Sequence, residues 1–208
     1  MTLQGGANIL DDVTAMGRAD SEGMLSHIAG LADQVVEGWR ISRELELPWE
    51  TPRSVALLGM GGSAIGGELV RAVWADRISV PVEILRGYEL PAWVGPATLV
   101  IASSKSGDTE ETLRQLETAL SRRCPVVCVS AGGALRRVAE AASLPLAVIP
   151  DAGPPRASAG WSLGLVAGIL QTAGALELGE AENEAAVASA QETAARCAPE
   201  VPTAENPA

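Results

Sequence analysis

Residues 53–75 read RSVALLGMGGSAIGGELVRAVWA: a short apolar strand pattern over 53–58, a glycine-rich turn, and a helix pattern over 64–75. Similar patterns follow along the chain. We expect further strands at 80–86, 99–103, 125–130 and 146–149, and further helices at 109–122 and 134–142. These strands are too continuously apolar for a sheet with one face in water. The sequence therefore predicts an α/β fold with a doubly wound parallel sheet, helices on both faces, and ligands at the carboxyl ends of the strands.

Helical patterns flank this alternating series of strands and helices. Residues 9–46 have a helical periodicity that Pro48 and Pro52 end. Their apolar stripe consists of Met24, Ile28, Leu31, Val35 and Trp39. Residues 158–178 are expected to form one long helix interrupted by glycines, and residues 180–197 a polar, alanine-rich helix. With 208 residues the chain has room for one such domain and helical extensions, whereas two full domains would be a tight fit.

The composition argues against several classes of protein. A net charge of −11 disfavours a broad nucleic-acid-binding face, because such faces depend on clustered Lys and Arg. No stretch has the ~20 consecutive apolar residues of a membrane span, and the first residues lack the basic flank and apolar run of a signal peptide. We therefore expect a cytoplasmic protein that binds neither nucleic acid nor membrane.

The three cysteines indicate no disulfide framework. Cys124 and Cys128 stand at the two ends of an expected strand, about 13 Å apart on an extended backbone, which is too far for a bridge. We expect these two and Cys197 to be reduced. A metal site is not expected, since His27 is the only histidine that could join them.

Two serine-bearing loops carry the chemistry. Gly59–Ser63 follows the first expected strand, and Ser104–Thr109 follows the strand at 99–103. Glycine lets the backbone approach an anion closely, while hydroxyls and the N–H groups of a helix N-terminus donate hydrogen bonds to phosphate oxygens. The two loops together predict a cradle for a sugar phosphate, and neither loop needs a metal or another cofactor.

Each loop also has a competing interpretation. Gly59, Gly61 and Ala64 fit the dinucleotide fingerprint G-x-G-x-x-A, with Glu83 at the distance of a ribose-binding acid. Glu83 falls inside its strand pattern, however, and no second mononucleotide half follows. In the second loop, Asp108 and Glu111 fit a helix-capping box that would form without any ligand. Lys105 is expected to be an exposed lysine.

The loops also support a family resemblance. Gly61–Gly67, Ser104–Thr112 and Pro155-Arg156-Ala157 resemble, in this order, motifs of the bifunctional phosphoglucose/phosphomannose isomerases, which have the sugar isomerase (SIS) fold. A helix over 20–34 resembles the N-terminal arm of that family. The resemblance implies a five-stranded, flavodoxin-like, three-layer SIS domain over 53–180, a helical arm over 1–52, and a C-terminal helix with an interdomain linker over 181–208.

The resemblance also implies site residues and ligands. Gly61, Gly62 and Ser63 would lie against the sugar, and the residues that bind its phosphate would be Ser104, Ser106 and Thr109. Arg156 would be the catalytic residue facing the reacting carbons, where a fixed cation stabilises the charge of a cis-enediolate. The implied ligands are glucose 6-phosphate, fructose 6-phosphate and mannose 6-phosphate, with no cofactor and no metal.

The chain also departs from the family pattern. Members have two SIS domains, the second of which supplies a catalytic glutamate and histidine, so this chain resembles an N-terminal half only. We expect turnover to need a homodimer or a C-terminal SIS partner, and His27, Glu68, Glu110 and Glu111 to be solvated or capping residues. Lys105, Asp108 and Trp161 replace the usual aromatic residue, asparagine and tyrosine. The alternatives are a non-catalytic or regulatory sugar-phosphate-binding module and a dinucleotide-binding enzyme.

Overall fold

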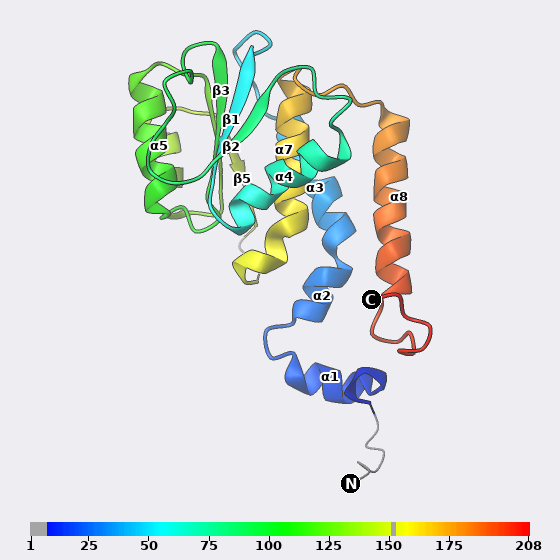
Figure 1. Ribbon diagram of the computed structural model, residues 1–208. Coiled ribbons are helices and arrows are strands. Elements are labelled where there is room, and N and C mark those ends of the chain that lie inside the picture. Colours follow the sequence, from blue (N-terminus) through cyan, green and yellow to red (C-terminus); the bar gives the residue numbers. More distant parts are fainter. Residues whose placement is uncertain (1–7, 151–152) are drawn as a thin grey trace.

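A computed structural model describes residues 8–150 and 153–208, and its centre is a five-stranded sheet (Figure 1). The strands lie in the order β2-β1-β3-β4-β5, and every pairing is parallel. Their bounds are β1 Ser54–Leu58, β2 Val82–Leu85, β3 Thr98–Ser103, β4 Val126–Ser130 and β5 Leu146–Val148. This order is the flavodoxin-like one. The predicted doubly wound parallel sheet is therefore confirmed.

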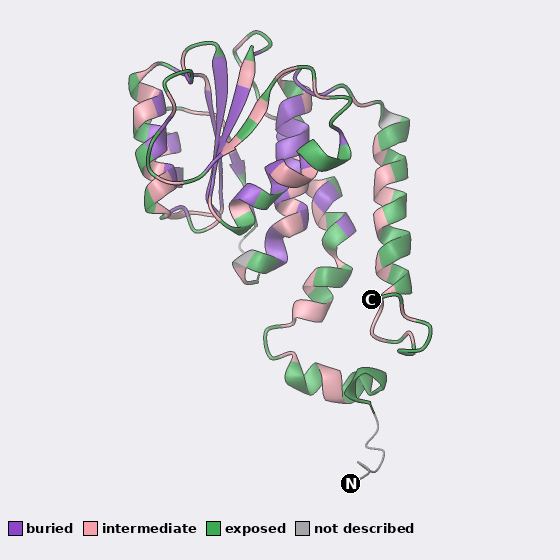
Figure 2. Ribbon diagram, in the orientation of Figure 1, coloured by how far each residue is buried: buried purple, intermediate pink, exposed green. Residues whose placement is uncertain are grey.

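Helices cover both faces of the sheet. Figure 1 shows α5 (Glu110–Ser121) on one side, and α3 (Leu31–Arg43), α4 (Gly62–Val73) and α7 (Ala159–Thr172) on the other. α6 (Gly133–Ala141) packs on the same face as α5. Along β3, Leu99 and Ile101 face α7, while Val100 and Ala102 face α5. All four are buried, because each face of a doubly wound sheet meets helices. The central strands are accordingly coloured as buried in Figure 2.

The helices α3 and α7 approach each other backbone to backbone. Gly160, Gly164 and Gly168 recur every fourth residue along α7 and face α3. A Cβ at Gly164 would lie 2.9 Å from the carbonyl carbon of Val35, and one at Gly168 would lie 2.6 Å from the Cβ of Ser42. No side chain fits on α7 at these three positions, so the glycines set the distance between the two helices.

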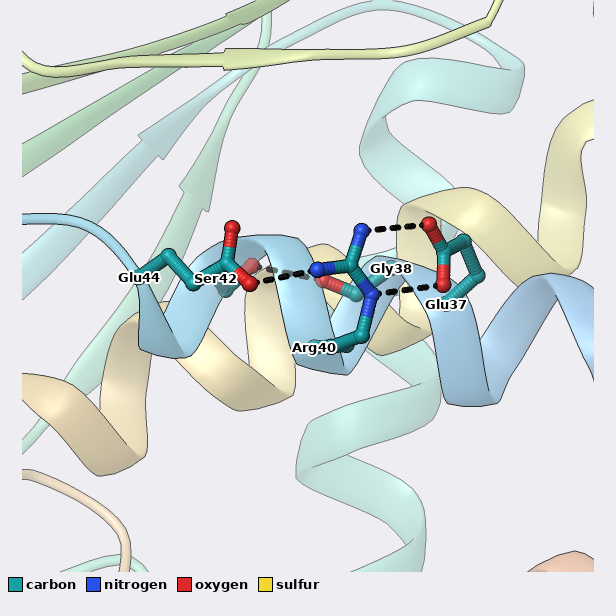
Figure 3. Close-up of polar contacts among 5 residues, drawn as sticks. All are labelled: Glu37, Gly38, Arg40, Ser42 and Glu44. Atoms are coloured by element: carbon teal, nitrogen blue, oxygen red, sulfur yellow. Dashed lines mark hydrogen bonds and ion pairs between the residues drawn. The ribbon is translucent and has the colours of Figure 1, made fainter.

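Figure 3 shows the two opposite faces of α3. On the buried face, the hydroxyl of Ser42 donates to the carbonyl oxygens of Gly38 and of Leu165 in α7, both at 2.9 Å. On the solvent face, Arg40 lies between Glu37 and Glu44, donating to Glu37 at 2.7 and 2.8 Å. The hydrogen bonds from Arg40 lower the pKa of Glu37. Because Arg40 and Glu37 are exposed, this pairing adds little stability, and the buried face of α3 holds the helix in place.

The N-terminal arm is helical but not continuous. It consists of η1 (Ile9–Asp11), α1 (Val13–Ala19), α2 (Met24–Ala29) and α3. The expected helix over 20–34 is wrong, because the carboxylate of Asp20 accepts hydrogen bonds from the backbone of Met24 and Leu25, at 2.7 and 2.8 Å. Asp20 thus ends α1 and supports the start of α2. The part of the arm from η1 to α2 extends away from the sheet, whereas α3 packs beside α7 (Figure 1).

The predicted helix over 158–178 is too long. The four residues Pro155–Ser158 form the 3-10 helix η2, and α7 then ends at Thr172. Gly174 has φ +71°, and Leu176 pairs with Ile78 in an antiparallel bridge. The chain therefore turns back to cover the apolar core instead of extending the helix.

The last helix, α8 (Glu180–Arg196), matches the predicted polar helix and shows mostly exposed and half-buried residues (Figure 2). Beyond it, Thr203 donates to the carboxylate of Asp11 from both its N–H and its hydroxyl, at 2.7 Å each. This contact ties the C-terminal segment to the arm. No helix in the described part of the chain is both long and apolar enough to cross a membrane.

Candidate functional site

A cavity of about 290 Å³ lies where β1, β3 and β5 end. Its hydroxyl-bearing lining residues are Ser63, Ser103, Ser106, Thr109, Ser158 and Ser162. Lys105, Met60, Ile149, Gly61 and Gly62 complete the lining. No residue in this described lining is acidic, although the chain carries a net charge of −11. The cavity is therefore suited to an anionic or strongly polar ligand.

A larger open groove, of about 840 Å³, lies beside the amino end of β2. Arg71, Glu83 and Trp93 are among its lining residues. In doubly wound folds, however, ligands bind at the carboxyl ends of the strands, where loops and helix N-termini converge. The smaller cavity is therefore the candidate site, although the groove is larger.

The first loop joins β1 to α4. Gly61 has φ +49° and ψ −123°, a backbone conformation that L side chains rarely adopt, and α4 begins at the next residue. The hydroxyl of Ser63 accepts a hydrogen bond from the backbone N–H of Lys105 at 3.2 Å. Ser63 thus links the first loop to the second. Gly61, Gly62 and Ser63, the residues expected against the sugar, all line the cavity.

The second loop joins β3 to α5. Ser106 and Thr109 line the cavity, whereas Ser104 is 1% exposed and lies behind them. The hydroxyl of Ser104 forms a hydrogen bond with that of Thr109 at 2.8 Å and accepts one from the N–H of Gly107 at 3.1 Å. Thr109 precedes α5, and its side chain does not cap that helix. The N-terminus of α5 and the two hydroxyls thus adjoin the cavity, a combination that favours an anion.

Asp108 caps a different helix from the one we expected. Its carboxylate accepts a hydrogen bond at 2.9 Å from the N–H of Ala134, in the first turn of α6. The predicted capping of α5 by Asp108 is therefore wrong. Gly107, with φ +77°, turns the chain so that Thr109 becomes the N-cap residue of α5. The negative charge of Asp108 is thereby held at the start of α6, outside the lining of the cavity.

Lys105 is half-buried rather than exposed as expected. Its backbone N–H donates to Ser63, and its ammonium group donates to the carbonyl oxygen of Gly153. Gly153 also touches the arm, since a Cβ at this position would lie 2.7 Å from Cε1 of His27. Lys105 also lines the cavity, and Gly153, which binds its ammonium group, is not among the lining residues.

Arg156 does not line the cavity. It lies in η2, its side chain is 64% exposed, and its guanidinium donates to the carboxylate of Glu22, between α1 and α2. The sequence pattern that indicated Arg156 gave no sign of this partner, because the two residues are far apart in the chain. Three serines that were not predicted as site residues also line the cavity, namely Ser103, Ser158 and Ser162. Ser158 and Ser162 lie one helical turn apart after Arg156, and this spacing was the available signal.

The carboxylates near the loops have other partners. Glu68 forms an ion pair with Arg86 at 3.0 Å, and Glu110 accepts a hydrogen bond from the hydroxyl of Tyr88 at 3.4 Å. Negative charge from Glu111, with desolvation and Glu110 adding to it, raises the pKa of Tyr88. Within residues 8–150 and 153–208, no group of three or more His, Cys, Asp or Glu could hold a metal ion.

Several curated proteins similar to this chain are bifunctional phosphoglucose/phosphomannose isomerases. A bifunctional phosphoglucose/phosphomannose isomerase from Caldicellulosiruptor bescii is 34% identical over 185 residues, which cover 88% of this chain and 55% of that protein. The chain thus spans about half the length of the curated relatives that it matches. No protein-family model matches it.

Solved structures agree with this fold. A hypothetical protein from Thermus thermophilus superposes with a TM-score of 0.70 at 26% identity, over 96% of this chain and 50% of that one. The C-terminal domain of glucosamine-fructose-6-phosphate aminotransferase from Francisella tularensis has a TM-score of 0.60 at 16% identity, over 84% of this chain and 54% of that one. This second likeness shows the fold alone. By sequence, the chain is related to the bifunctional phosphoglucose/phosphomannose isomerases, of which it spans about half.

Proposed function

We propose that this chain is the sugar-phosphate-binding SIS domain of an aldose–ketose isomerase. The reaction would interconvert glucose 6-phosphate or mannose 6-phosphate with fructose 6-phosphate through a cis-enediolate. One observation carries the proposal. The cavity at the carboxyl ends of the strands is lined by six hydroxyl-bearing residues and Lys105, and the described residues of that lining include no carboxylate.

The geometry supports a division of roles within the cavity. Ser106 and Thr109 would bind the phosphate together with the N-terminus of α5, whose partial positive charge favours an anion. Ser104 would act from behind by holding the hydroxyl of Thr109 at 2.8 Å. Gly61, Gly62 and Ser63 would contact the sugar. The phosphate end and the sugar end would thus be bound by different loops.

Arg156 would stabilise the charge of the enediolate, as the family resemblance implies. It now pairs with Glu22, so reaching the reacting carbons would require this exposed ion pair to open. Exposed ion pairs contribute about 0–1 kcal/mol, so the opening would cost little.

A general base would come from outside the cavity described above. Isomerisation moves a proton between C1 and C2, and a positioned base typically contributes about 10²–10⁴ in rate. No carboxylate of the described lining could serve as this base. The chain matches only 55% of the relative from Caldicellulosiruptor bescii, although the match covers 88% of the chain. We therefore infer that it corresponds to the N-terminal of two SIS domains, and that a second SIS domain or a second copy of the chain supplies the base.

The principal alternative is a non-catalytic or regulatory module that binds the same sugar phosphates. Such a module would have the same cavity as the isomerase domain, but no partner would restore turnover. The dinucleotide alternative has less support, because Glu83 is the second residue of the edge strand β2 rather than at its carboxyl end.

Calorimetric titration with fructose 6-phosphate and with 5-phosphoarabinonate, an enediolate mimic, would test the proposal. Ser106→Ala should weaken both ligands, whereas Arg156→Ala should weaken the anionic mimic more. Arg136→Ala is the matched control, since Arg136 is an exposed arginine paired with Glu140, away from the cavity. Absence of saturable binding at millimolar concentrations would refute binding by this chain alone.

A further inference from the structure

The hydroxyl of Ser158 is a buried group without a partner. The residue is 6% exposed, and its Oγ has no hydrogen-bond partner among the residues that the structure describes. Leaving a buried hydroxyl unpaired costs stability, so most such groups in folded proteins find a partner, a water or a ligand. Ser158 therefore has unused hydrogen-bonding capacity in the folded chain.

The position of Ser158 makes this capacity available to a ligand. Ser158 precedes α7 at the position where serine usually caps a helix, yet its side chain makes no capping hydrogen bond. It lines the cavity instead. Ser162, one turn further along α7, is 4% exposed, lines the same cavity, and donates to the carbonyl oxygen of Ser63 only at 3.5 Å. Two hydroxyls on one face of α7 thus adjoin the space where a ligand would lie.

Two other buried polar atoms in the described chain also lack a partner, and they provide a comparison. They are Oε1 of Gln34 and Oγ1 of Thr112. Neither residue lines the cavity. Of the three, Ser158 is therefore the one whose missing partner could be a bound molecule.

We propose that Ser158, with Ser162 beside it, binds a hydroxyl group of the polyol part of the ligand. The inference rests on the proposed function, in which the phosphate lies at Ser106 and Thr109. A serine hydroxyl both donates and accepts, and so does the hydroxyl of a sugar. Because Ser158 directly precedes α7 and the phosphate loop leads into α5, the two contacts would bind different ends of one molecule. The cavity would then prefer hydroxylated phosphate esters to phosphate itself.

The test compares two ligands, fructose 6-phosphate and inorganic phosphate, in NMR titrations that reach millimolar concentrations. Ser158→Ala should weaken fructose 6-phosphate about threefold to tenfold, the effect of losing one neutral hydrogen bond, and leave the affinity for inorganic phosphate unchanged. The melting temperature without ligand should be equal or higher, because the variant removes an unpaired buried hydroxyl. Ser162→Ala should show the same selectivity with a smaller effect.

Thr112→Val is the matched control, because it also removes an unpaired buried hydroxyl but lies outside the cavity lining. It should leave both affinities unchanged. The proposal is overturned if Ser158→Ala binds fructose 6-phosphate as the wild type does, or if it weakens both ligands equally. In either case, the proposed function would stand if the wild type binds fructose 6-phosphate and Ser106→Ala weakens that binding. If the wild type binds neither ligand, the proposed function fails and this proposal fails with it.

Discussion

Substitution of Gly107 by alanine should distort the second loop and destabilise the whole chain. Gly107 has φ +77°, in the left-handed region. A Cβ at this position would overlap the carbonyl group of Gly132, lying 2.6 Å from its carbon, and would lie 2.9 Å from the Cα of Gly133. These are backbone atoms, so no side-chain rotation relieves the clash. The carbonyl oxygen of Gly107 also accepts a hydrogen bond from the N–H of Leu135 at 2.8 Å, which ties the loop to α6.

The expected loss of stability has two parts. The left-handed conformation costs a non-glycine residue about 1–2 kcal/mol, and forcing extra volume into a packed site costs about 1–3 kcal/mol, so the free energy of unfolding should fall by about 2–5 kcal/mol. Displacement of the loop should also move Ser106 and Thr109. Binding of fructose 6-phosphate should therefore weaken even in the fraction that stays folded.

Urea unfolding followed by tryptophan fluorescence would measure this loss, since Trp39 and Trp74 lie in the core with ring centroids 6.0 Å apart. The midpoint should fall by about 1 M urea or more, given slopes of about 1–3 kcal/mol per molar urea. Gly95→Ala is the matched control, because its φ is not positive and no atom lies within 4 Å of the added Cβ. It should be neutral or stabilising by up to about 1 kcal/mol. Equal midpoints for the two variants would refute the reasoning.

Three further predictions concern α7, Arg156 and Cys128. Gly164→Ala should destabilise the chain by about 1–3 kcal/mol in urea unfolding, since overpacking against the backbone of α3 outweighs the higher helix propensity of alanine; an unchanged midpoint would contradict this. Glu22→Gln should release Arg156 and tighten binding of 5-phosphoarabinonate in calorimetry, whereas weaker binding would show that the ion pair organises the site. Burial raises the pKa of Cys128 to about 12, from 9.0. Because its thiolate forms more readily in the unfolded chain, Cys128 should contribute stability that is complete below pH 9 and declines above it, which urea unfolding at a series of pH values would detect.

The sheet was predictable because its signals are local. Each strand is a short apolar run, and each following helix begins after glycines or hydroxyl residues, so type and order could be predicted from neighbouring residues alone. The parallel arrangement then brings the loops after β1 and β3 to the same edge of the sheet. This is why Gly61, Ser63, Ser106 and Thr109 were predicted to meet, and they line one cavity.

The features that the sequence did not predict depend on contacts between distant residues. Asp108 caps α6 because Gly107 turns the loop toward Gly132, and a local capping pattern cannot show this. Arg156 meets Glu22 only because the arm folds back on η2. Ser158 resembles an ordinary capping serine until its unpaired hydroxyl and the nearby cavity are seen together.

The glycines of α7 restrict how this chain can change in evolution. In most cores a layer of side chains lies between helices, and neighbouring residues can adjust when one of them changes size. At Gly160, Gly164 and Gly168 no such layer exists, so an added methyl group must push on the backbone or on a side chain of α3. A deep mutational scan should therefore find these three positions intolerant even of alanine, while the half-buried positions of α8 accept many residues. Sequence divergence among functional variants would then accumulate outside the contact between α3 and α7.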